Sequence, residues 1–477
     1  MQRPFTVYSL LFFLGWCGST LPLCAQQDTR PNIIFIITDD QQVGLLGVEG
    51  NPTAHTPNID RIGKEGMLFK NAFVTTPLCS PSRASFFTGN YSSKHLVINN
   101  DKIGLDAISH TLNTWPRRLR ETGYETAFIG KWHMGLDDSR RPGFDRWMSF
   151  KGQGDYVDGV INDEGLRKQT TGYMTDIIND HAVEFLQRAH DKPFAMIVAH
   201  KAVHWPIIPA KRHEDLYSDV KFEIPEPPKG DLEGKQVLSS KFERKPVYAL
   251  ENVMPEMPES RRGRSNTPSN IFADEHRCMQ SVDDGVGAML KQLEDMGELD
   301  NTLIIYVSDN GMLMGEHGQF NKKRWAYDPV LRIPMLMRYP KLIEAGSTRE
   351  QMVQNIDVAP TILELAGVEP IEPMQGTSLL PILKNEKAPW RESMLHEYFF
   401  EKVVVHVRPW QAVRTEEWKY IHYTEGTFDD ELYHLANDPE EIHNLANDKK
   451  YKKQLAIMKA ELLRLTMKED VRSGKVR

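Results

Sequence analysis

The chain has 477 residues, of which 40% are hydrophobic and 26% are charged. Such a composition is typical of a folded globular protein, and the length allows one large hydrophobic core and a smaller second unit. The formal net charge of -8 excludes a protein that binds nucleic acid through an overall positive field. It leaves open a local cluster of cations that binds an anionic substrate.

The N-terminus has the features of an export signal. Arg3 precedes an apolar run at residues 5–16, and Leu23, Cys24 and Ala25 then form a candidate cleavage site. The apolar run is too short to span a membrane. We therefore predict a signal peptide at residues 1–25 and an exported protein, periplasmic or secreted, without an integral membrane span. A lipid anchor on Cys24 is the alternative.

Removal of residues 1–25 leaves two cysteines, Cys79 and Cys278. Cys278 lies in a segment with apolar residues at helical spacing, which favours a buried hydrophobic role. Cys79 lies among proline, serine and arginine residues, a composition that is unusual for a core. An exported protein could join the two in a disulfide.

Short apolar runs predict buried parallel strands at residues 33–37, 126–129, 194–199 and 303–307. Helical patterns lie between them, at residues 173–188 and in a long segment around Cys278 that Gly297 would end. This alternation predicts an α/β fold with a large mixed, mostly parallel sheet and helices on both faces. Residues 26–383 would form this large domain.

The pattern changes from about residue 384. Segments 393–398, 403–407, 410–415 and 418–423 predict consecutive antiparallel strands, and a stripe of apolar residues from Tyr451 to Leu465 predicts a final helix. Residues 384–477 would form a smaller α+β subdomain. The irregular segment 208–270 is interpreted either as a solvated insertion or as a rim that shapes a substrate cleft.

Polar residues follow each of the four predicted buried strands. In open α/β sheets ligands bind beyond the carboxyl ends of the strands, so a site is predicted at this edge. The residues brought there are Asp39, Asp40, Lys131, His133, His200, His204, Asp309 and Asn310.

The acidic residues of this group predict a metal site. Asp39 with Asp40 alone could be a helix N-cap. However, adjacent carboxylates repel one another in a half-buried site unless a cation lies between them, and Asp309 with Asn310 would complete a cage. Such oxygen ligands suit calcium or magnesium and fit zinc or copper poorly.

Cys79 is predicted to lie at a helix N-terminus. Pro81 suits a first helical position, and Gly89 would end the helix. Free N–H groups and the helix dipole would favour an anion there. An unmodified Cys79 would then be a reactive thiol, so a Cys–His hydrolase is an open alternative.

The run C-S-P-S-R at Cys79 to Arg83, followed by A-S-F-F-T-G-N-Y, resembles the signature of type I sulfatases, which are formylglycine-dependent enzymes of the alkaline phosphatase-like superfamily. The similarity extends over nearly the whole chain after residue 25. It includes P-N-I-I-F-I-I-T-D-D, G-K-W-H-M-G, H-W-P, S-D-N-G, L-R-I-P-M-L-M-R-Y-P and E-L-Y-H-L-A-N-D-P-E-E.

The resemblance implies that a formylglycine-generating or sulfatase-maturating enzyme oxidises Cys79 to formylglycine (3-oxoalanine). It implies one Ca²⁺, with Mg²⁺ as the alternative, and the ligands Asp39, Asp40, Asp309, Asn310 and the modified Cys79. One hydroxyl of the hydrated aldehyde would attack sulfur and expel the alcohol.

Further roles are implied for the cations and histidines. His133 would deprotonate the second hydroxyl and release sulfate, and Arg83 would hold the formylglycine. Lys131 and His204 would bind the sulfate, and His204 could protonate the leaving alcohol. With one divalent ion, these cations would outweigh the three carboxylates and admit an anion.

A further sulfate-binding lysine is implied, and the sequence offers two. Counting forward from Gly318 gives Lys322, whereas counting back from Tyr327 gives Lys323. We predict Lys323, because Arg324 and Tyr327 then keep their expected offsets.

A sulfated carbohydrate, such as a glycosaminoglycan, a mucin glycan or an algal polysaccharide, is the predicted substrate. The alternatives are a phosphate or phosphonate monoester hydrolase of the same superfamily, an arylsulfatase acting on small esters, and a non-catalytic glycan-binding protein. Among single residues, His200 is predicted to be structural and Trp132 to pack. His317 could contact substrate or form a loop hydrogen bond.

Overall fold

The computed structural model describes residues 1, 30–100, 104–239, 268–370, 372–402, 404 and 407–473. The signal peptide predicted at residues 1–25 lies outside the described residues except for Met1. Within the described part of the chain, none of the helices combines the length and the apolar character that a membrane span requires.

A ten-stranded mixed sheet forms the centre of the molecule. Five neighbouring strands are parallel, and antiparallel pairings occur toward both edges. This confirms the predicted mixed, mostly parallel sheet. Across the sheet, the strands are β13 (Ser347–Arg349), β2 (Met67–Phe69), β12 (Met335–Arg338), β9 (Thr302–Ser308), β1 (Asn32–Thr38), β8 (Phe194–Ala199), β4 (Glu125–Gly130), β5 (Arg146–Ser149), β6 (Val160–Asp163) and β7 (Leu166–Gln169).

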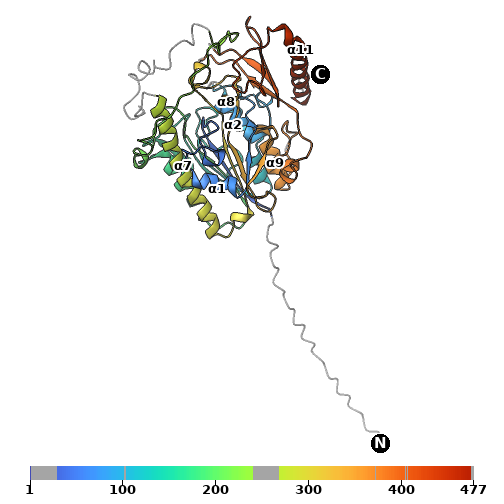
Figure 1. Cartoon of the computed structure of the whole chain (residues 1–477). Helices are drawn as coiled ribbons and strands as arrows, with labels where there is room; N and C mark the ends of the chain where they lie inside the picture. Colours follow the sequence, from blue (N-terminus) through green and yellow to red (C-terminus); the bar gives the residue numbers. More distant parts are fainter. Residues whose placement is uncertain are drawn as a thin grey trace.

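Helices cover both faces of this sheet (Figure 1). On one face lie α1 (Pro57–Lys64), α6 (Met174–Leu186) and α7 (Pro268–Asp295); on the other lie α2 (Cys79–Thr88), α5 (Trp115–Glu121) and α9 (Val358–Leu365). The central strand β1 is buried on both sides: Ile34 faces the first layer, and Phe35 faces the second. This two-sided burial explains why the strand sequence is a continuous apolar run.

Several predicted helices are present with small shifts. α6 and α7 occupy the predicted segments, and Gly297 (φ 71°) follows α7 with its N–H bonded to Glu294 O at 2.9 Å. The helix predicted before Gly89 begins at Cys79, so Pro81 is its third residue and not its first. Proline is tolerated there because the first turn has no intrahelical acceptor for its N–H.

Shorter elements connect these layers. The short helices are α3 (Ser92–His95), α4 (Leu105–Thr111), α8 (Asp328–Leu331) and α10 (Leu380–Lys384). Two small sheets pair β10 (Leu313–Met314) with β11 (Phe320–Lys322) and β14 (Val353–Gln354) with β3 (Ala72–Phe73).

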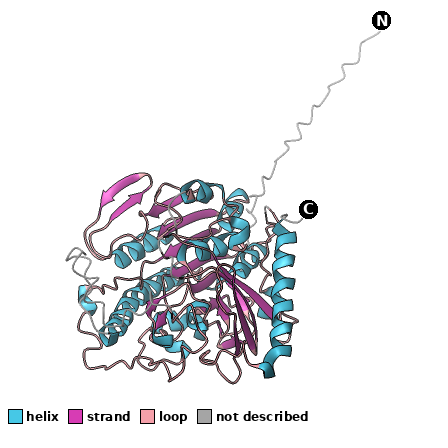
Figure 2. Ribbon diagram, turned by 90° about the horizontal axis from the view of Figure 1, so that it is seen from above, coloured by secondary structure: helices cyan, strands magenta, loops and turns pink. Residues whose placement is uncertain are grey.

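An antiparallel sheet forms the C-terminal part, as predicted, and has four strands, of which the last had not been predicted. Its strands are β15 (Ser393–Tyr398), β16 (Trp410–Thr415), β17 (Trp418–Tyr423) and β18 (Glu431–His434). Helix α11 (Lys452–Ser473) packs beside these strands, through residues such as Met458 and Leu462 (Figure 2). Residues on the other face of this sheet, including Ala412 and Ile421, belong to the main core. The domain boundary at residue 384 stays a prediction.

The strand predicted at residues 403–407 lies between β15 and β16, which pair directly with each other. Residues 403, 405 and 406 lie outside the described residues, and Val404 and Val407 belong to no strand. The prediction of a strand from this apolar run is therefore wrong for these two residues. They border a cavity instead of joining a ladder.

The predicted insertion is irregular where it is described. Residues 208–239 contain only turns and the 3-10 helix Lys211–His213, and residues 240–267 lie outside the described residues. Its buried Lys235 contacts Asp231 and lies 3.1 Å from the Nδ1 atom of His317. Nearby, the buried carboxylate of Glu431 accepts hydrogen bonds from the hydroxyls of Tyr327, Tyr423 and Tyr433 at 2.6–2.8 Å. These contacts tie the insertion and the C-terminal sheet to the loop that precedes α8.

Candidate active site

The carboxyl ends of β1 and β9 bring two acidic pairs together. Thr38 of β1 is in parallel register with Ser308 of β9, so Asp39 and Asp309 leave the sheet side by side. The N–H of Asp309 donates to Thr38 O at 3.1 Å, and the N–H of Asp40 donates to the Oδ1 atom of Asp309 at 3.0 Å. The two strand ends are therefore locked to each other by hydrogen bonds.

Four potential ligand atoms converge at this point. The donor atoms of Asp39, Asp40, Cys79 and Asp309 all lie within 4.8 Å of one another, and all four residues are buried. Asn310 donates to Asp40 Oδ1 at 2.7 Å, while its own buried Oδ1 has no hydrogen-bond partner among the described residues. Three carboxylates and one unused amide oxygen fit a hard divalent cation such as Ca²⁺ or Mg²⁺.

The electrostatics of the three carboxylates are unequal. Burial, followed by the charge of Asp39, raises the pKa of Asp309 to about 7. Burial also acts to raise the pKa of Asp39, but Lys131 and further cations outweigh it and hold that pKa well below the usual value. Without a metal ion the cluster therefore keeps a proton near neutral pH, as expected for like charges confined in a buried space.

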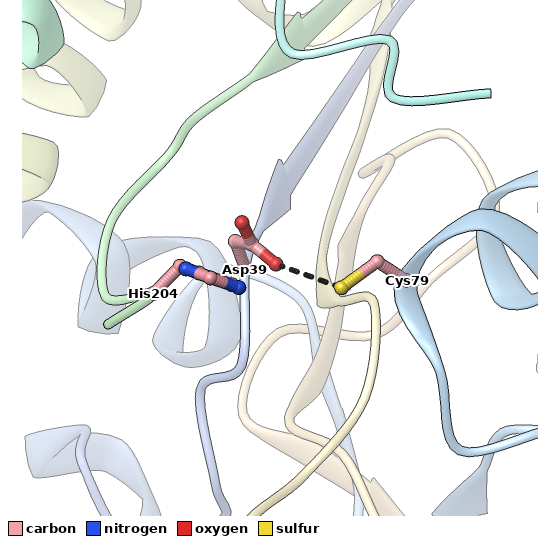
Figure 3. Close-up of side chains that lie close together, drawn as sticks. All are labelled: Asp39, Cys79 and His204. Carbon is pink, nitrogen blue, oxygen red and sulfur yellow. Dashed lines mark hydrogen bonds between the residues drawn. The ribbon is translucent and has the colours of Figure 1, made fainter. Parts of the chain in front are cut away.

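Cys79 lies at the first position of α2, directly beside this cluster. Its Sγ atom is 3.5 Å from Asp39 Oδ1 and 4.0 Å from Asp40 Oδ1, and it accepts a 2.8 Å hydrogen bond from Lys323 Nζ. Figure 3 shows Cys79 and His204 approaching Asp39 from opposite sides.

The thiol of Cys79 is not the reactive group that its helix position predicted. The side chain is 0% exposed, and burial raises its pKa to about 12 despite the nearby lysines. Desolvation therefore outweighs the helix N-terminus, and the thiol stays protonated at neutral pH. This disfavours the Cys–His hydrolase that the sequence left open.

Arg83 links three parts of the site. It lies one helical turn after Cys79, so both side chains are on the same side of α2. Its Nε donates to Asp309 Oδ2 at 2.8 Å, and its Nη1 donates to the backbone O of Lys131 at 2.7 Å. Its buried Nη2 has no hydrogen-bond partner among the described residues and lies 4.0 Å from Asp39 Oδ1.

Two histidines and a lysine surround the acidic cluster. The Nζ of Lys131 contacts Asp39 and Gln153. His133 has a left-handed backbone (φ 56°), and its buried Nδ1 has no partner among the described residues. Burial lowers the pKa of His133 well below the usual value, and Lys131 lowers it further. An imidazole of this kind is neutral and can accept a proton.

His204 is placed by two contacts. Its Nε2 lies 3.6 Å from Asp40 Oδ2, and its Nδ1 lies 2.5 Å from the backbone O of Trp205. Because a carbonyl oxygen only accepts, Nδ1 carries the hydrogen and Nε2 faces the acidic cluster. Burial lowers the pKa of His204 to about 3, so the ring is neutral in the metal-free site.

The two candidate lysines have different positions. Lys323 is buried, and its Nζ bonds to both Cys79 Sγ and Asp40 Oδ1, the latter at 2.6 Å. Lys322 is the last residue of β11 and is exposed to solvent. The structure therefore brings Lys323 to the site and leaves Lys322 at its mouth.

Three other residues singled out in the sequence make structural contacts. His200 is buried and its Nε2 is 2.9 Å from Asn179 Oδ1, which is a structural contact. Trp132 packs against Phe87 with a ring separation of 5.3 Å. His317 forms a buried contact with an aspartate of the insertion, so the loop hydrogen bond is the role present here.

Both cysteines of the described chain are free, so the disulfide that the sequence allowed is absent. Cys278 lies in the core with 0% exposure, as predicted, and accepts a contact from the hydroxyl of Tyr173 at 3.5 Å. Cys278 lies on α7, which covers the face of the sheet opposite to the face that α2 covers, and this separates it from the acidic cluster.

Two residues near the site had not been predicted. Gln153, in the loop after β5, contacts Lys131, and nothing in its local sequence marks it. Lys201 follows β8 and is 3% exposed, with no ion-pair or hydrogen-bond partner for its ammonium among the described residues. That ammonium lies 4.8 Å from the ring of Tyr156. Burial, followed by repulsion from Lys131, lowers the pKa of Lys201 to about 8. The position of Lys201 directly after a predicted strand could have marked it as a candidate site residue.

Comparisons with known proteins agree with this geometry. The sulfatase family model matches residues 31–368, and the model of the N-sulphoglucosamine sulphohydrolase C-terminal region matches residues 315–468. The N-acetylglucosamine-6-O-sulfatase of Bacteroides thetaiotaomicron is 34% identical, over 93% of this chain and 87% of the relative. Human N-acetylglucosamine-6-sulfatase is 30% identical, over 92% and 84%.

A solved structure is also similar to this chain in its three-dimensional fold. It is a complex of a protein with its substrate D-glucosamine-2-N,6-O-disulfate, and it matches with a TM-score of 0.80 and 32% identity. The match covers 94% of this chain and 99% of that one. The chain belongs to the sulfatase family of the alkaline phosphatase-like superfamily and is a hydrolase of sulfate esters.

Proposed function

We propose that this sulfatase removes the 6-O-sulfate of glucosamine residues in a sulfated glycan. The observation that carries the proposal is the convergence of three carboxylates, Cys79 and Lys323 at one end of the sheet. The substrate follows from the relatives, two of which are N-acetylglucosamine-6-sulfatases, and from the solved complex with a 6-O-sulfated glucosamine.

We propose Ca²⁺ as the metal, held by Asp39, Asp40, Asp309 and Asn310 together with position 79. The buried, unpartnered Oδ1 of Asn310 and the mutual repulsion of the carboxylates support a cation there. The donor set is all oxygen, which suits Ca²⁺, and Mg²⁺ is the alternative. A bound divalent cation would supply positive charge that stabilises negative charge developing on the sulfate oxygens.

We further propose that Cys79 is oxidised to formylglycine. The signature around Cys79 supports this, and so does the pKa of about 12, because a protonated thiol is a poor nucleophile. When hydrated, the aldehyde supplies the two hydroxyls that the reaction uses, one for attack on sulfur and one for release of sulfate.

The chain's own residues would then perform separate tasks. Lys131 and Lys323 bind sulfate oxygens, and Arg83 holds Asp309 and the end of β4 in place. His133 accepts a proton, because its ring is neutral and its Nδ1 is free of other partners among the described residues. His204 presents Nε2 at the side of the cluster opposite to Cys79, where the leaving alcohol would lie (Figure 3). It would donate a proton from Nε2 only as the doubly protonated ring, a form that the negative charge of a bound sulfate ester would favour.

A substrate panel tests the proposed function. We expect hydrolysis of N-acetylglucosamine-6-sulfate, and no hydrolysis by a Cys79→Ala variant that unfolds at the same temperature as the wild type. Activity confined to small aryl sulfates, or to phosphate or phosphonate esters, would contradict the proposal. Mass spectrometry of the peptide that contains residue 79 tests the modification: an unmodified cysteine in active enzyme would exclude formylglycine.

Export is also proposed, from the sequence of residues 1–25. The mature protein is expected to begin near Gln26 and to be periplasmic or secreted. N-terminal sequencing of the protein recovered outside the cytoplasm checks this. A mature chain that begins with a lipidated Cys24 would establish the anchored alternative.

A further inference from the structure

The mouth of the active site is a cavity of about 240 Å³. Its lining includes the polar residues Asp40, His204 and Lys323 and the apolar residues Trp205, Met312 and Trp325. The cavity therefore places groups that would hold the scissile sulfate beside apolar side chains that a sugar ring could contact.

Most of the charges around this mouth are already paired. Lys323 bonds to Asp40 at 2.6 Å, and Arg324 forms an ion pair with the buried carboxylate of Glu401 at 2.5 Å. Lys322 differs from both. It lines the same cavity and is exposed, and its ammonium has no ion-pair or hydrogen-bond partner among the described residues.

The backbone of Lys322 is held in place. It ends β11, and its Cα pairs with that of Leu313 in β10, so the cation is carried by a hairpin and not by a free loop. The following residue, Lys323, reaches Sγ of Cys79 at 2.8 Å. Because Lys322 and Lys323 line the same cavity, Lys322 can hold a second group of a substrate whose ester is bound by Lys323.

We propose that Lys322 binds a second anionic group of the substrate, located outside the sulfate pocket. This inference rests on the proposed function and adds that the preferred substrates are glycans that carry another negative charge near the 6-O-sulfate. Two chemical sources fit: an N-sulfate on the same glucosamine and a carboxylate on an adjoining uronic acid. The chain thus uses its two consecutive lysines for different anions.

Three substrates separate these possibilities. N-acetylglucosamine-6-sulfate has no second anion, glucosamine-2-N,6-O-disulfate has one on the same ring, and a disaccharide of uronic acid and N-acetylglucosamine-6-sulfate has one on the neighbouring ring. The variants are Lys322→Gln and Lys322→Glu. Lys291→Gln is the matched control, because Lys291 is exposed on α7 and contacts only Asp295 in the described chain.

We expect Lys322→Gln to lower kcat/KM by roughly 2- to 5-fold for one of the doubly charged substrates, as a contact between exposed opposite charges allows. The loss in kcat/KM should come from a higher KM, with kcat unchanged. It should be larger for Lys322→Glu than for Lys322→Gln, and it should become smaller at 0.5 M salt. Hydrolysis of N-acetylglucosamine-6-sulfate and all values for Lys291→Gln should stay at the wild-type level. The substrate that is affected identifies the source of the anion.

Equal losses on all three substrates, or no loss on any, would overturn the inference while leaving the proposed function intact. Wild-type enzyme that is inactive on all three substrates would overturn the proposed function, and the inference with it. A lower kcat with unchanged KM would also contradict the inference, because it would place Lys322 in the reaction and not in substrate binding.

Discussion

Calcium binding to the acidic cluster should release a proton near neutral pH. In the metal-free protein, burial and the charge of Asp39 raise the pKa of Asp309 to about 7. A carboxylate must be deprotonated to bind a metal ion, so Ca²⁺ must displace this proton. We expect release of about 0.9 proton at pH 6, about 0.5 at pH 7 and about 0.1 at pH 8.

The protonation of Asp309 also determines the apparent affinity of the cluster for Ca²⁺. Since the protonated fraction of Asp309 cannot bind the metal ion, the apparent dissociation constant should rise about tenfold between pH 8 and pH 6. In the metal-free protein the raised pKa of Asp309 also makes the folded state bind more protons than the unfolded state. Its contribution to stability is therefore greatest at acid pH and is lost as pH rises from about 4 toward 7. Saturating Ca²⁺ reverses this loss by binding only the folded state.

Isothermal titration calorimetry provides the measurement. Titrations of Ca²⁺ at pH 6 in two buffers with different ionisation enthalpies give the number of protons released. Asp309→Asn is the control, because the amide has no proton to release and its Ca²⁺ affinity should not vary between pH 6 and pH 8. Zero release by the wild type at pH 6, or equal release by wild type and Asp309→Asn, would refute this account of the cluster.

Three further variants test the energetics. Arg83→Met should lower the free energy of unfolding by about 3–5 kcal/mol in urea, because it removes the guanidinium that pairs with the buried carboxylate of Asp309; a loss below 1 kcal/mol would contradict this. Lys201→Met should raise the free energy of unfolding at pH 7 by about 3 kcal/mol, because the folded pKa of about 8 lies below the unfolded value and the charged form is destabilised. That gain should disappear as pH rises from 8 to about 10.5, and a pH-independent gain would be inconsistent with it. Glu431→Gln should cost roughly 2–4 kcal/mol, because three buried tyrosine hydroxyls lose their charged acceptor; unchanged thermal unfolding would exclude that role.

The central strands could be predicted because they are buried on both faces. β1, β8, β4 and β9 are uninterrupted apolar runs, and helical patterns separate several of them, as expected for parallel strands. β2 and β12 carry no comparable signal, since strands of three or four residues are defined by their partners and not by their own sequence. The exposed β6–β7 hairpin, whose second strand has no buried residue, was missed for the same reason.

The residues of the site also divide into those that could be predicted from the sequence and those that could not. Residues that directly follow a long strand, such as Asp39 and Asp309, could be placed by the rule that strand ends share an edge. Gln153 and Glu401 reach the site on loops, so only the tertiary fold reveals them. Two counts from different motifs assigned the implied sulfate-binding lysine to two neighbouring residues, Lys322 and Lys323. The structure places Lys323, and not Lys322, in contact with the Sγ atom of Cys79.

The burial of Cys79 also determines when its proposed oxidation can occur. Its side chain is 0% exposed, and the residues on either side of it in the chain, Leu78 and Ser80, are almost as deeply buried. An enzyme that oxidises Cys79 would have to reach a side chain in the first turn of α2, which packs against the central sheet. Releasing that turn would also separate Arg83 from Asp309 and open the acidic cluster. We therefore expect the proposed modification to precede folding, while the signature is still an extended chain, and the proposed metal site would assemble around an already modified residue.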